Sequence, residues 1–214
     1  MALAQLAPHL IWKNQPQTDT LPSGIVSFDS LTGGCPRGRI TEITGAPSSG
    51  RTSLLHRILA AAGERGETTA VVDATNSFDP VTAASAGVDL DSLVWVRCSG
   101  NSEHAFKAAD LMLSAGGFGI VALDLCDVPR RHTQRIPISY WFRFQRAVEK
   151  SQTIFLLLNQ EPMAKSTAAL VAAVEREEAQ FVGGAPFELL RGARFRVEAR
   201  RPSHGVAEFS AAAV

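Results

Sequence analysis

The stretch from residue 40 to residue 66 constrains the fold more strongly than any other part of the chain. It reads ITEITGAPSSGRTSLLHRILAAAGERG: a short apolar run, a turn rich in glycine and serine, and a longer segment with apolar residues at helical spacing. The first run predicts a buried strand, and the last segment predicts a helix that Gly66 closes. A strand, a glycine-rich turn and a helix in this order predict a P-loop, whose backbone N–H groups surround a phosphate.

Apolar runs and helical segments alternate along the rest of the chain. Further strands are predicted at residues 68–73, 94–98, 120–125 and 153–158, and helices at residues 102–114, 139–150 and 166–180. Continuous apolar strands that alternate with helices indicate a parallel sheet covered on both faces. Residues 194–199 and 205–210 favour a closing hairpin. We therefore predict an α/β fold: a P-loop core with a mostly parallel, twisted sheet flanked by helices, and an antiparallel hairpin at the C-terminal edge.

The sequence divides into three parts. Residues 1–20 are expected to form an N-terminal arm and a polar linker, residues 21–205 the P-loop domain, and residues 206–214, which are rich in alanine, a frayed tail. In the arm, helical spacing is kept by Leu3, Leu6, Leu10 and Ile11. A helix there would either dock on a partner or pack on its own domain, and the sequence favours neither.

Composition indicates the compartment and the kinds of partner to be expected for the protein. The formal net charge is +0, so a nucleic-acid-binding role would depend on local basic patches. The three cysteines, Cys35, Cys98 and Cys126, have no zinc-site spacing, and their odd number favours a reducing compartment. The N-terminus has no signal-peptide pattern, and no apolar run reaches the roughly 18 residues of a membrane span. We expect a cytoplasmic protein with no membrane partner.

The predicted P-loop departs from its usual pattern at one position. The pattern G-x-x-x-x-G-K-[ST] directs its lysine at the outer phosphates of a nucleotide, and Arg51 occupies that position here. Arginine keeps the charge, but its planar fork is bulkier and aims differently from an ammonium group. Nucleotide binding is therefore expected to be weakened, and efficient catalysis to be lost. The predicted nucleotide-binding residues of the loop are Gly45, Ala46, Pro47, Ser48, Ser49, Gly50, Arg51, Thr52 and Ser53.

Two side chains are predicted to hold Mg²⁺ if a nucleotide binds. Thr52 supplies the hydroxyl of the P-loop pattern, and Asp124 ends the apolar run IVALD, where a metal-holding carboxylate is expected. The alternative for Asp124 is a carboxylate that only caps the turn after its strand. Asp73 ends another strong strand, but the loop that follows it, ATNS, has no carboxylate to orient a water molecule.

Beyond the P-loop, a series of segments resembles the bacterial RecA recombinases. The segments are PSGIVSFDSLTGG, PRGRITEITGAPSSGRTS, VVDATNSFDPVTAASAGVDLDSL, IVALD and LLNQ. Their order and spacing agree with RecA over roughly residues 20–200, which is far more specific than a lone P-loop. The resemblance implies a RecA-like α/β core with an ancestry in DNA repair. It also implies ATP and Mg²⁺ as ligands, bound weakly or no longer bound.

The sequence departs from the family at the positions that carry catalysis. Arg51 stands for the P-loop lysine, and Thr75 stands for the glutamate that activates the attacking water, although threonine cannot act as that base. Thr82 stands for the tyrosine that stacks on adenine, and a hydroxyl offers no stacking area. The resemblance assigns Asp79 to adenine contact and Gln160 to sensing the γ-phosphate. These departures predict a degenerate ATPase rather than an efficient enzyme.

Larger parts of the family pattern are also altered. The first 20 residues do not match the helix and strand that link RecA protomers, and the sequence stops at Val214 without the C-terminal domain of RecA. The trans-acting lysines of RecA have no evident match, and Arg191 is the nearest cation. After Gln160, residues 163–182 read as an alanine-rich helix with an acidic run, which would repel DNA phosphates.

A truncated branch of the family resembles this sequence more closely. It comprises the RecA-like accessory proteins of the translesion mutagenesis cassette, ImuA, and the segments APHLIWKNQ and WFRFQRAVEKS carry the likeness. This resemblance implies an SOS-induced role beside an inactive Y-family polymerase-like protein and an error-prone polymerase, or beside RecA itself. Single-stranded DNA and self-association are further candidates for contact.

Two surfaces are candidates for such contacts. Arg130, Arg131 and Arg135 lie in a basic segment where RecA has its first DNA-binding loop; the alternative is a solvated loop without a specific role. A later basic cluster, which would otherwise guard an edge strand, comprises Arg191, Arg194, Arg196, Arg200 and Arg201. The predicted helix at residues 139–150 offers a face for a protein partner through Tyr140, Trp141, Arg143 and Phe144. The alternative for this helix is that its aromatic residues face the core.

Three functions fit these observations. The first is a RecA-like DNA-repair accessory protein with a degenerate ATPase site, which acts in translesion synthesis or modulates RecA through protein contacts. The second is an active recombinase that binds ATP and single-stranded DNA, with Asp73 or Glu103 orienting water. The third is a nucleotide-gated regulatory ATPase outside DNA repair, which the RecA-type segments disfavour.

Overall fold

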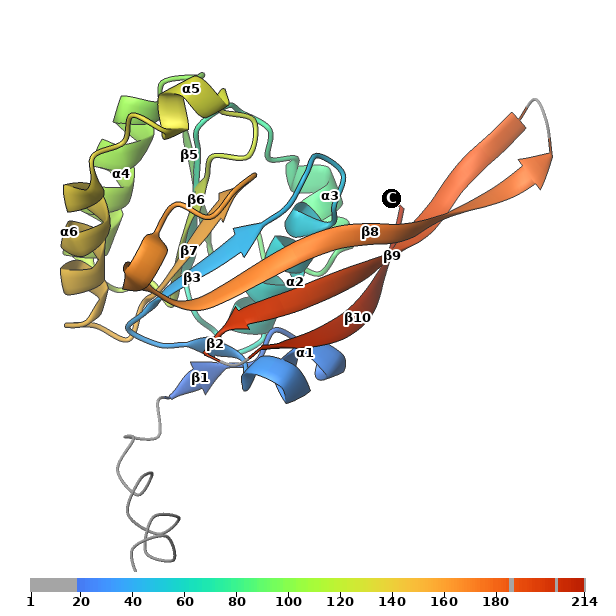
Figure 1. The fold of residues 1–214 in the computed structure, drawn as a ribbon, viewed down its shortest axis with the longest axis horizontal. Helices are drawn as coiled ribbons and strands as arrows, with labels where there is room; N and C mark the ends of the chain where they lie inside the picture. The colour runs from blue at the N-terminus through green and yellow to red at the C-terminus, as the bar shows by residue number, and fades with distance from the viewer. Residues whose placement is uncertain (1–18, 185–186, 203, 214) are drawn as a thin grey trace, which may run out of the picture.

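A central eight-stranded sheet organises the chain (Figure 1). The computed structural model describes residues 19–184, 187–202 and 204–213. The strand order is β10-β9-β8-β3-β7-β6-β4-β5, and all neighbours from β8 to β5 are parallel. The first six strands in sequence order within this sheet are β3 (Ile40–Thr44), β4 (Thr69–Asp73), β5 (Leu93–Arg97), β6 (Ile120–Asp124), β7 (Ile154–Asn159) and β8 (Ala168–Gly184). The predicted α/β fold with a mostly parallel sheet is confirmed.

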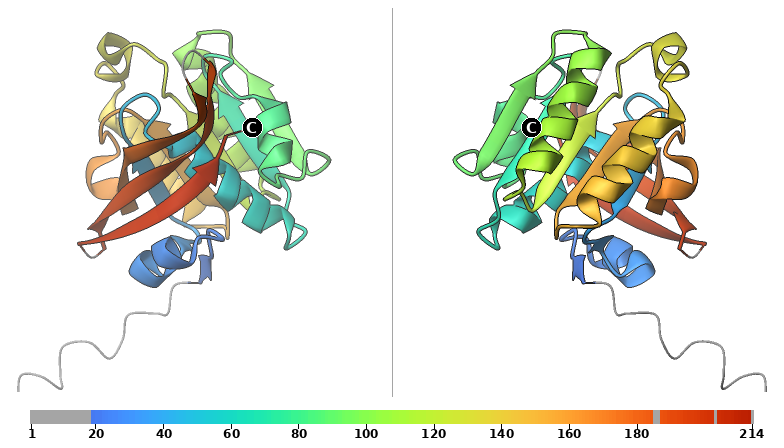
Figure 2. Two further views of the ribbon diagram at one scale, coloured as in Figure 1. Left: turned by 90° about the vertical axis from the view of Figure 1, so that its right-hand side faces the viewer. Right: turned by 90° about the vertical axis from the view of Figure 1, so that its left-hand side faces the viewer.

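Helices cover both faces of this sheet, as the two side views show (Figure 2). One apolar core lies between the sheet and the helices α1 (Val26–Thr32), α2 (Arg51–Gly63) and α3 (Pro80–Ser85). A second core lies on the opposite face, under α4 (Ser102–Ala115) and α6 (Ile138–Val148). Because β3, β4, β6 and β7 are apolar along their whole length, they can be buried from both sides.

Short elements complete the described part of the chain. β1 (Thr20–Leu21) and β2 (Cys35–Pro36) form a separate two-stranded sheet around α1. A one-turn helix, α5 (Arg130–Thr133), follows β6, and a 3₁₀ turn, η2 (Lys165–Thr167), precedes β8. No helix among these elements has the length and apolar character needed to cross a bilayer. The predicted N-terminal arm lies almost wholly in residues 1–18, outside the described residues.

Two predictions about the C-terminal third were wrong. The segments 166–180 and 163–182 do not form a helix, because β8 pairs in parallel with β3 from Ala168 to Ala173 and is buried on both faces there. An alanine-rich run that is buried on two sides has no alternation to distinguish it from a helix. Most of the predicted frayed tail at 206–214 is in a strand instead: β10 (Gly205–Ala212) pairs antiparallel with β9 (Phe187–Arg201) over eight register positions.

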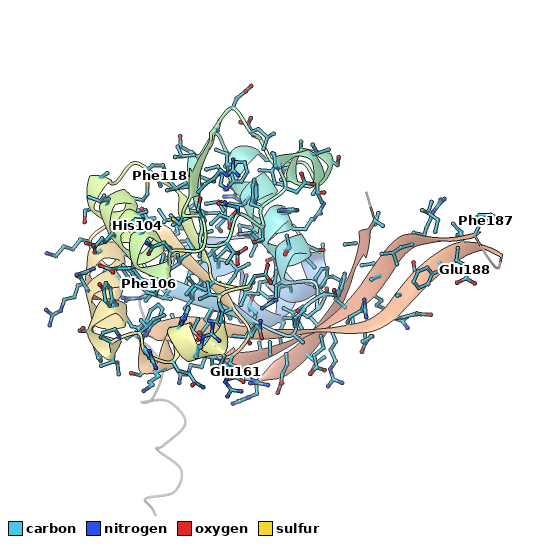
Figure 3. The ribbon with its side chains drawn as sticks, turned by 90° about the horizontal axis from the view of Figure 1, so that it is seen from above. His104, Phe106, Phe118, Glu161, Phe187 and Glu188 are labelled. Carbon is cyan, nitrogen blue, oxygen red and sulfur yellow. The ribbon has the colours of Figure 1, made fainter. Side chains whose placement is uncertain are left out.

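The predicted closing hairpin is confirmed, because residues 194–199 of β9 pair antiparallel with residues 205–210 of β10. On its other side β9 forms a second, longer hairpin with β8, which the sequence did not predict. β8 and β9 pair antiparallel from Val171 opposite Arg201 to Gly184 opposite Phe187. Beyond the body of the domain they continue as a two-stranded ribbon that projects into solvent, with Phe187 and Glu188 at its far end (Figures 1 and 3). The base of this ribbon passes beside the turn between β3 and α2, so it forms one wall of the candidate site.

Candidate phosphate-binding site

The glycine-rich turn joins the central strand β3 to the first turn of α2. Gly50 is the N-cap residue of α2, with φ of 97°, and Ser48 also has a positive φ, of 59°. The Ser49 N–H donates to the Ala46 carbonyl at 3.1 Å, which closes the turn. The amides of the first turn of α2 have no intrahelical acceptor, so they are available to an anion at this helix end. The predicted order of strand, glycine-rich turn and helix is confirmed.

Glycine is required at both ends of the turn. A Cβ atom on Gly45 would lie 2.3 Å from the Val174 carbonyl oxygen of β8. A Cβ atom on Gly50 would lie 2.5 Å from Cδ1 of Phe195, whose ring covers this position from β9. Since Gly50 also has a positive φ, a side chain there would be strained as well as crowded. The neighbouring strands therefore hold the turn in a fixed shape.

Two buried polar groups in the turn have no partner in the protein. Arg51 is only 6% exposed, and its Nη1 atom makes no hydrogen bond. Ser49 is 4% exposed, and its Oγ atom is also without a partner. A buried donor that makes no hydrogen bond is costly, so both groups suit an anion that would accept from them. The donors of this site therefore fit a phosphate group, with arginine in place of the usual lysine.

Asp124 lies at the carboxyl end of β6, directly opposite Asp73 at the end of β4. Its Oδ1 accepts from the Cys126 amide at 2.9 Å. Burial raises the pKa of the Asp124 carboxyl, and the nearby charge of Asp73 acts in the same direction. Burial raises the pKa of the Cys126 thiol, and the charge of Asp124 acts in the same direction, whereas the positive charge of Arg51 opposes this rise.

Asp73 has a structural role that leaves it no part in orienting water. Its carboxylate is fully buried and accepts from the amides of Thr75, Ser77 and Phe78 at 3.1, 3.1 and 2.9 Å. The indole Nε1 of Trp95 donates to the same carboxylate at 3.3 Å. Four donors occupy the acceptor sites of this group, so it holds the loop after β4 in place. The sequence had suggested Asp73 as a strand end and as a residue that could orient water, and it did not reveal these four donors.

Thr75 faces its own loop. Its hydroxyl donates to the Ser77 Oγ at 3.4 Å, and its half-buried side chain has no proton-accepting carboxylate beside it within residues 74–78. Glu103, the other suggested base, is on α4, which covers the sheet face opposite to α2. It pairs there with Lys107 at 2.7 Å. Neither Asp73 nor Glu103 is therefore placed to act instead of a catalytic glutamate.

Gln160 follows β7 and reaches the segment after Asp124. Its Nε2 donates to the Cys126 carbonyl at 2.9 Å. Next to it, Glu161 pairs with Arg130 of α5 at 2.8 Å. The loops after β6 and β7 are thus joined to each other at the edge of the sheet where the turn lies.

Glu42, a buried carboxylate that the sequence did not reveal as a site residue, also holds the loop after β7. Glu42 in β3 is fully buried, and its Oε1 accepts from Asn159 Nδ2 at 3.0 Å and from the amides of Met163 and Ala164 at 2.6 and 3.1 Å. Its only sequence signal is a charged residue inside an apolar strand. Glu42 therefore ties the strand that leads into the turn to the segment that contains Gln160.

Asp79 caps the N-terminus of α3. Its carboxylate accepts from the Val81 and Thr82 amides at 3.2 and 3.1 Å and from the Thr82 hydroxyl. These hydrogen bonds, led by the one from the Thr82 hydroxyl, lower the pKa of Asp79. Thr82 lines a hollow of about 730 Å³, together with Ser53 and His56 of α2. The predicted adenine contact thus lies on a helix cap beside an open hollow, and no aromatic residue lines that hollow from α3.

Trp141 and Phe144 of α6 face the core, which corrects half of the predicted partner surface. Trp141 is 2% exposed and Phe144 is fully buried. The Phe144 ring packs against Phe106 of α4 and Phe155 of β7, with centroid distances of 5.9 and 4.9 Å. Tyr140 is only half-exposed and Arg143 lies over its ring at 4.6 Å. An apolar helix face packed on a sheet is not available to another protein.

The predicted DNA-binding arginines are at the surface. Arg130, Arg131 and Arg135 are exposed on and just after α5, and Arg130 is the member paired with Glu161. In the later basic cluster, Arg194 pairs with Glu177 and Glu178, and Arg200 with Glu198. Carboxylates therefore balance part of both basic segments, and their role in DNA contact stays a prediction.

The fold and the turn together define a P-loop protein. Its core is of the type found in nucleotide-binding proteins and is built on a parallel sheet. Residues 8–132 match the family model described as RecA N-terminal domain. That match spans more than half of the chain, and the chain belongs to this family. All three cysteines in the described residues are free and buried.

Individual relatives support the same assignment. The chain is 32% identical to Protein RecA of Lactobacillus acidophilus over 164 residues, which cover 69% of this chain and 45% of that protein. It is 42% identical to Protein RecA of Francisella tularensis subsp. novicida over 108 residues, which cover 50% of this chain and 30% of that protein. The chain therefore spans less than half the length of the curated relatives that it matches.

A solved structure has the same fold. The crystal structure of the RadB recombinase superposes with a TM-score of 0.67 and 19% sequence identity, covering 89% of this chain and 95% of that chain. At this identity the likeness concerns the fold alone. The chain is thus a RecA-family, recombinase-like protein.

Proposed function

We propose that this protein is a RecA-like DNA-repair accessory protein that holds a nucleotide without hydrolysing it efficiently. The observation that carries the proposal is the pair of residues at the chemical positions, Arg51 in the turn and Thr75 after β4. Asp73 is fully engaged by four donors, and no carboxylate within residues 74–78 replaces the missing base. A phosphate can be bound at such a site, but water beside it would not be activated.

ATP with Mg²⁺ is the ligand that suits the donors best. The turn amides, Ser49 and Arg51 would hold the phosphates, and Thr52 and Asp124 would hold Mg²⁺, whose charge neutralises the phosphates. No group of three or more His, Cys, Asp or Glu side chains in the described residues could hold a metal ion alone. Mg²⁺ would therefore enter with the nucleotide, whose oxygens complete its coordination. Binding is proposed to be weak, because α3 offers no aromatic residue beside Asp79 on which the base could stack.

The protein would then act through contacts with other proteins. The proposed partners are the polymerase-like and error-prone polymerase proteins of an SOS-induced translesion pathway, or RecA itself, in a reducing cytoplasm that suits three free cysteines. Because Trp141 and Phe144 are buried, the partner surface must lie elsewhere than the apolar face of α6.

Two assays test the proposal. Thermal-shift titration with Mg-ATP should raise the unfolding temperature, because a ligand that binds only the native state stabilises it. Steady-state phosphate release, with and without single-stranded DNA, should stay at the level of an Asp124→Ala control. Pull-down of mutagenesis polymerases or of RecA would support the pathway, and recovery of unrelated proteins alone would contradict it.

An active recombinase is the second candidate, because Asp124 and Gln160 both lie at the edge of the sheet that carries the turn. It would need another residue to orient water and contacts between copies of the chain. Filaments on single-stranded DNA in electron micrographs, together with DNA-dependent ATP turnover, would favour it over the accessory role.

A further inference from the structure

The phosphate-binding turn is flanked by two hollows. One, of about 590 Å³, is lined by the turn and by Gln160 with the two residues after it. The other, of about 260 Å³, is lined by residues 48–53 and by Phe195. Three residues line both hollows: Ser48 and Ser49 of the turn, and Arg176 of β8. Arg176 is thus a side chain from another element that borders the turn on both sides.

Strand pairing explains why Arg176 points toward the turn. Arg176 is directly opposite Phe195, and residues opposite each other on paired strands lie on the same face of the sheet. Phe195 is the residue whose ring covers Gly50, so Arg176 emerges beside the N-terminus of α2. The pairing then shifts register between Arg176 and Glu178. Such irregularities re-aim side chains and are frequent beside functional sites.

Arg176 also differs from Arg194 and Arg200 in forming no ion pair. Arg194 pairs with two glutamates, with N–O distances of 2.9 and 3.5 Å, and Arg200 pairs with Glu198 at 3.1 Å. Arg176 is exposed and forms no ion pair with any carboxylate of the described residues. An exposed guanidinium of this kind is free to bind an anion that enters the turn.

We propose that Arg176 binds the polyphosphate of a nucleotide held in the turn, as a second guanidinium that acts beside Arg51 within the same chain. The inference rests on the proposed nucleotide site. Arg51 is buried in the turn with an unpartnered Nη1, and Arg176 approaches from the strand side, so the two cations would meet different phosphate oxygens. One guanidinium group can donate two parallel hydrogen bonds to phosphate oxygens, which suits Arg176 to this role. The ribbon that carries Arg176 thereby becomes part of the nucleotide site.

Arg176→Gln tests the proposal, with Arg196→Gln as the matched control. Arg196 is exposed on the same ribbon and also unpaired among the described residues, but its register partner is Glu175, so it lies on the opposite face. Affinity for Mg-ATP, tripolyphosphate and a single-stranded oligonucleotide is measured for the wild type and both variants. Unfolding temperatures without ligand should agree among the three proteins.

The expected result is that Arg176→Gln weakens binding of both Mg-ATP and tripolyphosphate about tenfold, as loss of a charged hydrogen bond does. Arg196→Gln should change either affinity less than about twofold. Equal affinities of Arg176→Gln and the wild type, equal losses in both variants, or no binding by the wild type would overturn the proposal. So would a loss confined to the oligonucleotide, which would mark Arg176 as a nucleic-acid contact. Rapid hydrolysis by the wild type would contradict the accessory function but not the role of Arg176.

Discussion

Replacing Asp73 by asparagine separates a structural carboxylate from a catalytic one. The fully buried carboxylate accepts from three backbone amides and from the Trp95 indole. One oxygen accepts from Thr75 and Ser77, and the other accepts from Phe78 and Trp95. Whichever way the asparagine amide is turned, its NH₂ group would face two donors.

The expected loss of stability follows from the number of hydrogen bonds that are lost. Two hydrogen bonds to a charged acceptor are lost, at about 1.5–3 kcal/mol each, so Asp73→Asn should lower the free energy of unfolding by about 3–6 kcal/mol. Urea unfolding followed by tryptophan fluorescence measures this loss, and Trp95, whose Nε1 lies 3.3 Å from the carboxylate, contributes to that signal.

Asp124→Asn provides the matched control. Asp124 ends the neighbouring strand but accepts from one backbone amide only, that of Cys126. Burial raises the pKa of Asp124, so its charged form disfavours the native state above the unfolded pKa of about 4. The asparagine variant should therefore match or exceed the wild-type stability at pH 7, and the difference should shrink as the pH falls below that value. An Asp73→Asn variant within about 1 kcal/mol of the wild type would refute the structural role.

Three further predictions concern the packing around the site. Burial lowers the pKa of His56. The stability given by neutral His56 is thus present above its unfolded pKa of about 6.5 and is lost as the pH falls. Urea unfolding at pH 5 and 7.5 should therefore show that the free energy of unfolding decreases more on acidification in the wild type than in His56→Gln. Phe144→Ala should cost about 3–5 kcal/mol in urea unfolding, whereas Phe142→Ser, at a position 45% exposed, should change stability by less than about 0.5 kcal/mol; equal effects would contradict the assignment of this helix face to the core. Gly50→Ala, which adds a Cβ against Phe195 at a positive φ, should destabilise by more than about 1 kcal/mol and abolish the thermal shift with Mg-ATP, and an unchanged shift would show that the turn does not hold phosphate.

The central part of the fold could be read from the sequence because its signals are local. The runs IVALD and TIFLLL are apolar throughout, and each becomes a strand buried on both faces. The turn at residues 45–52 has glycines where neighbouring atoms leave no room for a side chain. For these segments, composition, turn chemistry and long-range packing favour the same structure.

The C-terminal third could not be read in this way. Residues 168–174 are rich in alanine, which favours helix, but pairing with β3 makes them the strand next to the centre of the sheet. The acidic residues Glu175, Glu177 and Glu178 continue that strand into the ribbon, where Arg194 of β9 pairs with Glu177 and Glu178. Both outcomes depend on contacts between residues far apart in the sequence.

The candidate site, too, could be predicted from the sequence only in part. The sequence identified Arg51 and Thr75 as departures, because a motif fixes which positions matter. It did not reveal the four donors on Asp73, the loop contacts of Glu42, or the position of Arg176 beside the turn. Strand register decides these contacts, and no local pattern records it.

Steady-state ATP hydrolysis tests the central claim most directly. Phosphate release by the wild-type protein is measured with Mg-ATP, with and without single-stranded DNA, beside the Asp124→Ala variant. The account predicts no difference between the two proteins, because Thr75 offers no base and Asp73 has no free acceptor site. Turnover by the wild type at the rate of an ordinary recombinase, lost in the Asp124→Ala variant, would contradict it.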